Sequence, residues 1–304
     1  DFMTDDIYSL SAAGRIDQYE GASLRTGTWK SDDAMVSYFS RVNYALKDRY
    51  LFSATIRTDG SSKFGKDNRW GWFPSVSGGW RISEEPFVKA NAKWLNQLKV
   101  RASYGITGTN SIINYANTNL LDPAPYVLGA GNGSVIVGFA NNSKTLGNSS
   151  LQWEQTGEYN IGVDISVLNS RIGITFDYYY AITKSLLYEK TVNSVSGYNK
   201  AWTNEGKLRN KGFEVELTTH NFNGRKFKWN TSFNISVTRN RLLDLGGPAE
   251  QITLGSNKQY YIARVGEPLI QFYGYKTIGV WKTQEEVDSN PHHVSDRPGL
   301  ILPL

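Results

Sequence analysis

The chain has 304 residues, a formal net charge of +5, 13% aromatic residues and no cysteine. The absence of cysteine excludes disulfide scaffolds, thiolate metal sites and cysteine nucleophiles, and the mild charge does not argue for a nucleic-acid partner. The aromatic content is not that of a disordered chain, and no apolar stretch approaches the roughly 18 residues of a membrane-spanning helix.

Alternation of polar and apolar side chains along the chain predicts eight β-strands. In chain order they cover residues 36–47, 50–59, 74–83, 98–107, 158–167, 171–183, 213–218 and 227–238, with 74–83 the weakest. Most span about ten residues, which exceeds the usual length in soluble sheets and matches transmembrane β-strands. Their polar faces carry full charges, and their apolar faces are rich in aromatic side chains.

The connections between the predicted strands alternate in length. Three are predicted to be hairpin turns: Asp48-Arg49, Asn169-Ser170 and Asn223-Gly224. Three are long: residues 60–73, 108–150 and 185–204. Outer-membrane barrels have short periplasmic turns and long extracellular loops, so the pattern predicts that every long loop lies outside the cell, with 108–150 the largest.

Residues 84–97 are longer than the other connections on the short-turn side. Ser83 is predicted to cap a brief helix there, with Phe87, Trp94 and Leu95 on one face. Residues 252–282 are interrupted by glycine and proline, which predicts irregular or edge strands. The first and last strands are therefore not expected to pair with each other in a closed eight-stranded ring.

Aromatic side chains are predicted at both membrane interfaces, where one side of the ring is apolar and the other wet. The set near the short turns, on the periplasmic side, is Tyr44, Tyr50, Trp80, Phe227 and Trp229. The set near the long loops, on the extracellular side, is Tyr104, Trp153, Tyr178 and Tyr180.

The charged residues of the polar faces are candidates for facing the lumen of a barrel. A charge that faces lipid at mid-depth costs about 2–4 kcal/mol, so these side chains are expected inside. The candidates are Arg41, Arg57, Arg81, Arg101, Asp164, Asp177, Glu214, Glu216 and Lys228.

No catalytic, cofactor or metal site is predicted. His292 and His293 are adjacent but lack a third ligand nearby, so a solvated loop is the favoured interpretation. Glu214 and Glu216 could suggest a glycosidase carboxylate pair, but a charged lumen explains them together with the other polar faces. The loop from Asp59 to Gly65 is interpreted as structural.

An ordered series of segments resembles the barrel of SusC/RagA-type TonB-linked outer-membrane proteins. These segments are residues 57–84, 98–108, 176–180 with Thr183-Lys184, 210–217, 229–234 and 272–275. The resemblance implies an all-β fold, an antiparallel up-and-down transmembrane barrel of about 22 strands in the full proteins. Residues 1–304 are then expected to form a partial barrel domain, with the plug domain and the closing strands outside this chain.

The resemblance also implies a function. Proteins of this type import large nutrients, oligosaccharides or peptides, through the Gram-negative outer membrane. They work with a SusD-like surface lipoprotein and with the TonB complex, which would act through an N-terminal part absent here. The Asp-rich loop expected after Arg297 to Ile301 is missing, so no ion site is carried over. No cofactor is expected.

Two other functions are also compatible with the sequence. One is a soluble β-sandwich that binds glycans, which would bury its apolar face and have loops of similar length at both ends. The other is an outer-membrane barrel enzyme, which three histidines support poorly.

Overall fold

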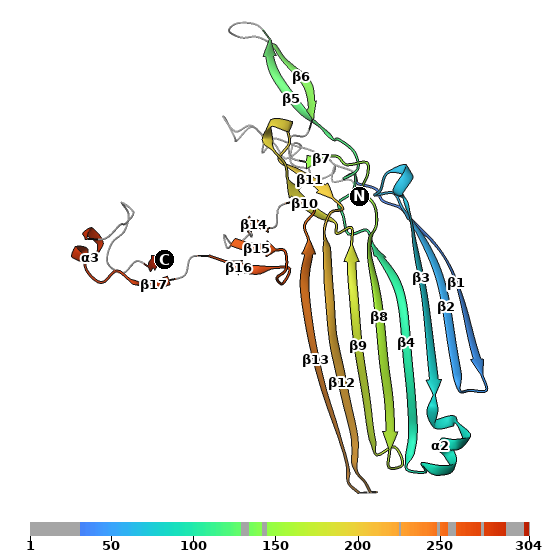
Figure 1. Cartoon of the computed structure of the whole chain (residues 1–304). Helices are drawn as coiled ribbons and strands as arrows, with labels where there is room; N and C mark the ends of the chain where they lie inside the picture. The colour runs from blue at the N-terminus through green and yellow to red at the C-terminus, as the bar shows by residue number, and fades with distance from the viewer. Residues whose placement is uncertain are drawn as a thin grey trace, which may run out of the picture. The chain divides into compact units, whose positions relative to one another are not determined.

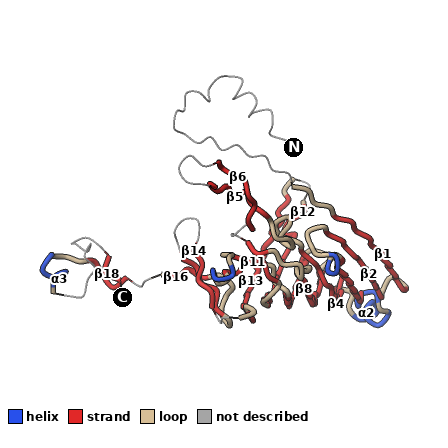
Figure 2. Tube along the Cα trace, turned by 90° about the horizontal axis from the view of Figure 1, so that it is seen from above, coloured by secondary structure: helices blue, strands red, loops and turns tan. Residues whose placement is uncertain are grey.

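The computed structural model describes residues 31–128, 134–141, 145–224, 226–247, 250–254, 260–274, 277–289 and 301–303. Most of this part of the chain is β-strand, and its helices are short (Figure 2). Among the described residues no helix is both long and apolar enough to cross a membrane.

Eight long strands form one sheet (Figure 1). In hydrogen-bonded order they are β1 (Met35–Leu46), β2 (Tyr50–Ser61), β3 (Trp70–Arg81), β4 (Leu95–Thr109), β8 (Glu154–Val167), β9 (Ile172–Lys184), β12 (Lys207–Asn223) and β13 (Lys228–Asp244). All eight predicted strands are confirmed. Since β1 and β13 stand at opposite ends of this order, the described sheet is open, as the sequence predicts.

The remaining strands are short. They are β5 (Leu121–Leu128), β6 (Ser134–Asn141), β7 (Thr145–Leu146), β10 (Tyr188–Thr191), β11 (Lys200–Thr203), β14 (Glu250–Leu254), β15 (Tyr260–Arg264), β16 (Gln271–Tyr273), β17 (Thr277–Val280) and β18 (Ile301–Pro303). The long segment after β4 is predicted to be a loop, but it contains a hairpin formed by β5 and β6. The helices are α2 (Pro86–Asn91) and α3 (Gln284–Asp288), with 3₁₀ turns η2 (Lys66–Asn68), η3 (Ile82–Glu84) and η4 (Ser194–Ser196).

The turn between β1 and β2 is a tight hairpin, as predicted. Lys47 and Asp48 adopt φ angles of 52° and 54°, the left-handed region that aspartate tolerates better than most residues. The amide of Arg49 donates a hydrogen bond to the carbonyl of Leu46 at 3.0 Å. The pairing of β1 with β2 therefore continues up to Leu46 and Tyr50, the residues on either side of the turn.

The helical turn between β3 and β4 differs from its prediction. Ser83 lies buried inside η3 and caps no helix. The helix α2 begins at Pro86, because proline lacks an N–H group and its fixed φ suits the first helical position. Trp94 follows α2 and Leu95 begins β4, so neither shares a helix face with Phe87.

Two cations hold Glu84 beside this turn. Lys89 Nζ lies 2.6 Å from Glu84 Oε2, and Arg81 donates to Glu84 Oε1 at 3.4 Å. The hydrogen bond from Lys89 is the main cause that lowers the pKa of the Glu84 carboxyl below its ordinary value. A carboxyl whose pKa is lowered by folding stabilises the fold above that ordinary value, and the stabilisation is lost as pH falls through the lowered pKa.

Replacing Glu84 with glutamine is therefore expected to destabilise the protein by about 0.5 kcal/mol at neutral pH, in the range for partly exposed ion pairs. The difference from wild type should begin to shrink as pH falls below the ordinary carboxyl value of 4.5, and it should vanish once pH lies below the lowered pKa of folded Glu84. Urea unfolding in lipid vesicles across this pH range measures it. In a Lys89→Met background the E84Q effect should be much smaller. A difference that grows on acidification would contradict the assignment.

Contacts divide the chain into two compact units. The first contains β1, β2, all of β3 except Arg81, and the long segments that follow β4 and β9. The second contains β9, β12, β13, the helical turn and the C-terminal strands.

The first unit has a dense apolar cluster where the long segments pack together. Trp153 is 5% exposed, and its ring centroid lies 5.3 Å from that of Phe64 and 5.4 Å from that of Phe73. The other buried members are Ile112, Ala116 and Leu151. Trp153 is thus a core residue of the loops, and its prediction as an interfacial aromatic is wrong.

Candidate functional site

The polar face of β1, β2 and β3 carries two of the predicted arginines. Arg41 lies opposite Thr55, and Arg57 lies opposite Phe39 and Phe73. Directly opposite residues of antiparallel strands project to the same face, so Arg41 and Arg57 share one face of the sheet. Arg41 Nε donates to Thr55 Oγ1 at 3.0 Å.

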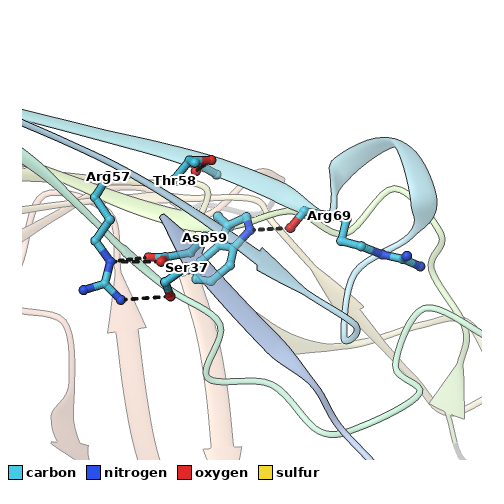
Figure 3. A network of polar contacts seen from close by, with 7 residues as sticks. Ser37, Arg57, Thr58, Asp59 and Arg69 are labelled. Atoms are coloured by element: carbon cyan, nitrogen blue, oxygen red, sulfur yellow. Dashed lines mark hydrogen bonds and ion pairs between the residues drawn. The ribbon is translucent and has the colours of Figure 1, made fainter. Parts of the chain in front are cut away.

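Arg57 is held by its neighbours on this face (Figure 3). Its Nε donates to both Asp59 carboxylate oxygens, at 2.9 and 2.8 Å, and one terminal nitrogen donates to Ser37 Oγ at 3.3 Å. Asp59 is only 7% exposed. Asp59 and Ser37 therefore fix the guanidinium of Arg57 near the end of β2 from which the long connection to β3 begins.

The opposite face of the same strands is apolar and aromatic. Tyr38 stacks on Trp70 with ring centroids 6.1 Å apart, and Tyr50 stacks on Trp80 at 6.3 Å. All four rings are exposed. A row of exposed aromatic side chains on one face and charges on the other matches the two environments of a transmembrane barrel wall.

An ion network in the second unit joins three of the predicted residues. Arg101 on β4 lies 3.3 Å from Asp164 on β8 and 2.6 Å from Asp177 on β9. All three side chains are between one sixth and one third exposed. Two carboxylates thus share one guanidinium, whose several N–H donors suit such a bridge.

Gly162 makes this network possible. Strand β8 lies between β4 and β9 in the sheet, so Arg101 must cross it to reach Asp177. A Cβ at Gly162 would lie 2.6 Å from both Arg101 Cζ and Asp177 Oδ1. Sequence reasoning does not single out Gly162, because its role depends on which strands are neighbours.

The acidic face continues across β12 and β13. Asp177 lies opposite Glu214, which lies opposite Ser236, and Ser236 Oγ donates to Glu214 Oε1 at 3.3 Å. Glu216 occupies the next position on the same face. Two shallow depressions of about 310 and 270 Å³ open on this surface, and both are lined by Glu216.

The other predicted residues lie at strand ends. Arg81 ends β3 and contacts Glu84, and Lys228 begins β13 opposite Asn223. The predicted residues therefore occur as separate polar groups within each unit, and in the second unit Arg101, Asp164 and Asp177 come together.

Metal binding finds no support among the described residues. They contain no group of three His, Cys, Asp or Glu side chains placed to hold a metal ion. His292 and His293 lie outside the described residues. His220 shares a hydrogen bond of 2.8 Å with Asn230 at the turn end of β12 and β13.

Comparisons with known proteins agree with this geometry. A family model described as the TonB dependent receptor-like β-barrel matches residues 2–281. A TonB-dependent receptor of Formosa agariphila is 36% identical over 90% of the chain, and the TonB-dependent receptor SusC of Bacteroides thetaiotaomicron is 35% identical over 84%. The chain spans about a quarter of each, 25% and 26%.

A solved structure of the RagAB peptide transporter is similar in fold. It aligns with a TM-score of 0.75 and 27% sequence identity, covering 87% of this chain and 28% of the transporter chain.

Proposed function

This chain belongs to the TonB-dependent receptor β-barrel family of the outer membrane, and we propose that it forms part of the wall of an importer of large nutrients. The nutrient is an oligosaccharide or a peptide. The two-faced sheet carries this proposal: an aromatic face toward lipid and a charged face toward a water-filled lumen. The nine charged residues predicted from the sequence then line the path of the solute.

The ion network of Arg101, Asp164 and Asp177 supports the lumen assignment. Three charged side chains in a lipid-facing position would cost several kcal/mol, whereas a hydrated lumen solvates their exposed parts. Asp177, Glu214 and Glu216 share one face by register. The apolar side chains Phe176 and Val215, which lie opposite each other, alternate with them on the other face.

Two partners complete the proposal. A SusD-like surface lipoprotein captures the solute and covers the barrel, and the TonB complex supplies energy through a plug domain carried by the rest of the protein. SusC and the RagAB peptide transporter are the relatives that support these partners. The chain itself binds and passes the solute and catalyses no reaction.

Uptake in cells tests the proposal. A strain that lacks the gene should lose uptake of either fluorescent oligosaccharides or fluorescent oligopeptides too large for porins, and the reintroduced gene should restore it. A protonophore should abolish the restored uptake, because TonB-driven import needs the proton-motive force. Wild-type uptake of both solute classes in the deletion strain would contradict importer function, and uptake that persists with the protonophore would contradict TonB coupling.

Purification tests the partner separately. The tagged protein, extracted in mild detergent, should carry a SusD-like lipoprotein in equal amount. If the protein needs detergent for extraction but carries no lipoprotein, the proposed partner is contradicted, whereas the proposed importer function is not. Release by carbonate wash without detergent would contradict the membrane barrel itself.

A further inference from the structure

Four cationic side chains gather on one face of β12 and β13. Arg209 lies directly opposite Arg241, and Lys211 lies directly opposite Arg239. Positions 209 and 211 alternate along one strand, and 239 and 241 along the other, so all four side chains project to the same face. We name these four residues the basic quartet.

The basic quartet continues the apolar face of the sheet. Phe213 and Val237 form the next opposite pair on that face, two residues from Lys211 and from Arg239. Beyond them the same face carries Val215 with Ile235 and then Leu217 with Phe233. The quartet is therefore on the side assigned to lipid and not on the side of the acidic lumen residues.

The height of the quartet follows from strand geometry. The apolar face ends at the turn with the stacked rings of Phe222 and Trp229, whose centroids are 6.0 Å apart. From Phe222 to Lys211 the strand advances roughly 36 Å. With the tilt of barrel strands this corresponds to about 28 Å of height, close to the apolar band of such barrels. Lys211 and Arg239 thus lie at the outer rim of the band.

Like charges directly opposite each other destabilise a sheet unless they are neutralised. Among the described residues no acidic side chain forms an ion pair with Arg209, Lys211 or Arg239. Arg241 Nε donates to the Gly266 carbonyl at 2.6 Å. Arg209 Nε is buried and has no hydrogen-bond partner among the described residues. The quartet therefore has donors and positive charge available for an anion.

We propose that the basic quartet binds the phosphate groups of phosphorylated lipid in the outer leaflet of the outer membrane. This rests on the proposed orientation, with the hairpin turns toward the periplasm. The guanidinium and ammonium groups bind phosphate by charge-assisted hydrogen bonds. The apolar rows below them contact the acyl chains of the same lipid. Such a lipid would link β12 to β13 across two like-charged pairs.

Lipid binding to the purified full-length protein tests the proposal. Phosphorylated lipid A in mixed micelles should bind tightly, and the same lipid after enzymatic removal of its phosphates should bind far more weakly. This comparison uses the wild-type protein, so it does not depend on the folding of any variant. Equal binding of the two lipids would overturn the proposal.

A double variant locates the site. Lys211→Gln with Arg239→Gln should bind phosphorylated lipid A roughly thirtyfold more weakly, as expected for the removal of two cations near a membrane surface. The matched control is Lys47→Gln with Lys226→Gln, at turns far along the strands, which should bind like wild type. Heat-modifiable gel migration checks that each variant is folded.

Two results would overturn the assignment. One is unchanged lipid binding by the folded double variant, including the case in which that variant instead loses a co-purifying lipoprotein. The other is an equal loss in the control variant. Because lipid binding is measured on purified protein, a negative result leaves the nutrient-uptake experiment unaffected.

Discussion

Replacing Trp153 with alanine is expected to lower the free energy of unfolding by about 3–5 kcal/mol, the range for large aromatic side chains removed from a core. The indole is 5% exposed and packs between Phe64 and Phe73. Its Nε1 also donates a hydrogen bond to the Arg69 carbonyl at 3.0 Å, which would be left without this donor. Both the ring contacts and this hydrogen bond join segments distant in sequence.

The effect of W153A is measured by urea unfolding in lipid vesicles and by protease treatment of intact cells. Cleavage within residues 110–153 should become faster, because this segment is anchored on the cluster through Ile112 and Leu151. The matched control is Trp94→Ala. Trp94 is 61% exposed, so W94A should lower the free energy of unfolding by no more than about 0.5 kcal/mol. Similar losses in both variants would contradict the role of the cluster.

Replacing Arg101 with methionine is expected to lower the free energy of unfolding by about 2 kcal/mol. Removal of one partner from a fully buried ion pair costs about 3–5 kcal/mol, and the one-third exposure of Arg101 reduces that figure. The methionine keeps the length of the side chain and removes the charge that Asp164 and Asp177 share. The two carboxylates would then face each other without a cation.

A second substitution separates charge from packing. Arg101→Met combined with Asp177→Asn should recover part of the loss, since one of the two repelling charges is gone. Arg41→Met is the control on the polar face of the first unit. Within the described part of the chain Arg41 makes one hydrogen bond, to Thr55, so R41M should lower the free energy of unfolding by no more than about 0.5 kcal/mol. A double variant no better than R101M would contradict the shared-cation interpretation.

The strands could be predicted because one physical rule governs them. A strand between lipid and water must alternate, and eight alternating segments were enough to place all eight long strands. The boundaries were less accurate where the rule changes. β12 begins at Lys207 and not at residue 213, because Arg209 and Lys211 occupy positions on the apolar face where apolar residues were expected.

The packing of the long loops could not be predicted from alternation. Phe73 occupies a position of the polar face, yet it is buried because Trp153 and Phe64 come to it from other segments. The network of Arg101 was partly predictable. Its three charges were identified from the polar faces, but their meeting depends on the order β4, β8, β9 and on the space above Gly162.

The long segments between neighbouring strands also bear on how readily such a wall can diversify. Residues 110–153 connect β4 to β8, whereas a four-residue turn connects β8 to β9. Closure entropy grows only with the logarithm of loop length, so this roughly tenfold longer connection costs about 2 kcal/mol more than the turn. Insertions into the long connections therefore leave the strand register unchanged and lower the free energy of unfolding only slightly. The molecule can acquire new loop sequences by mutation and recombination while the strands that support them stay the same.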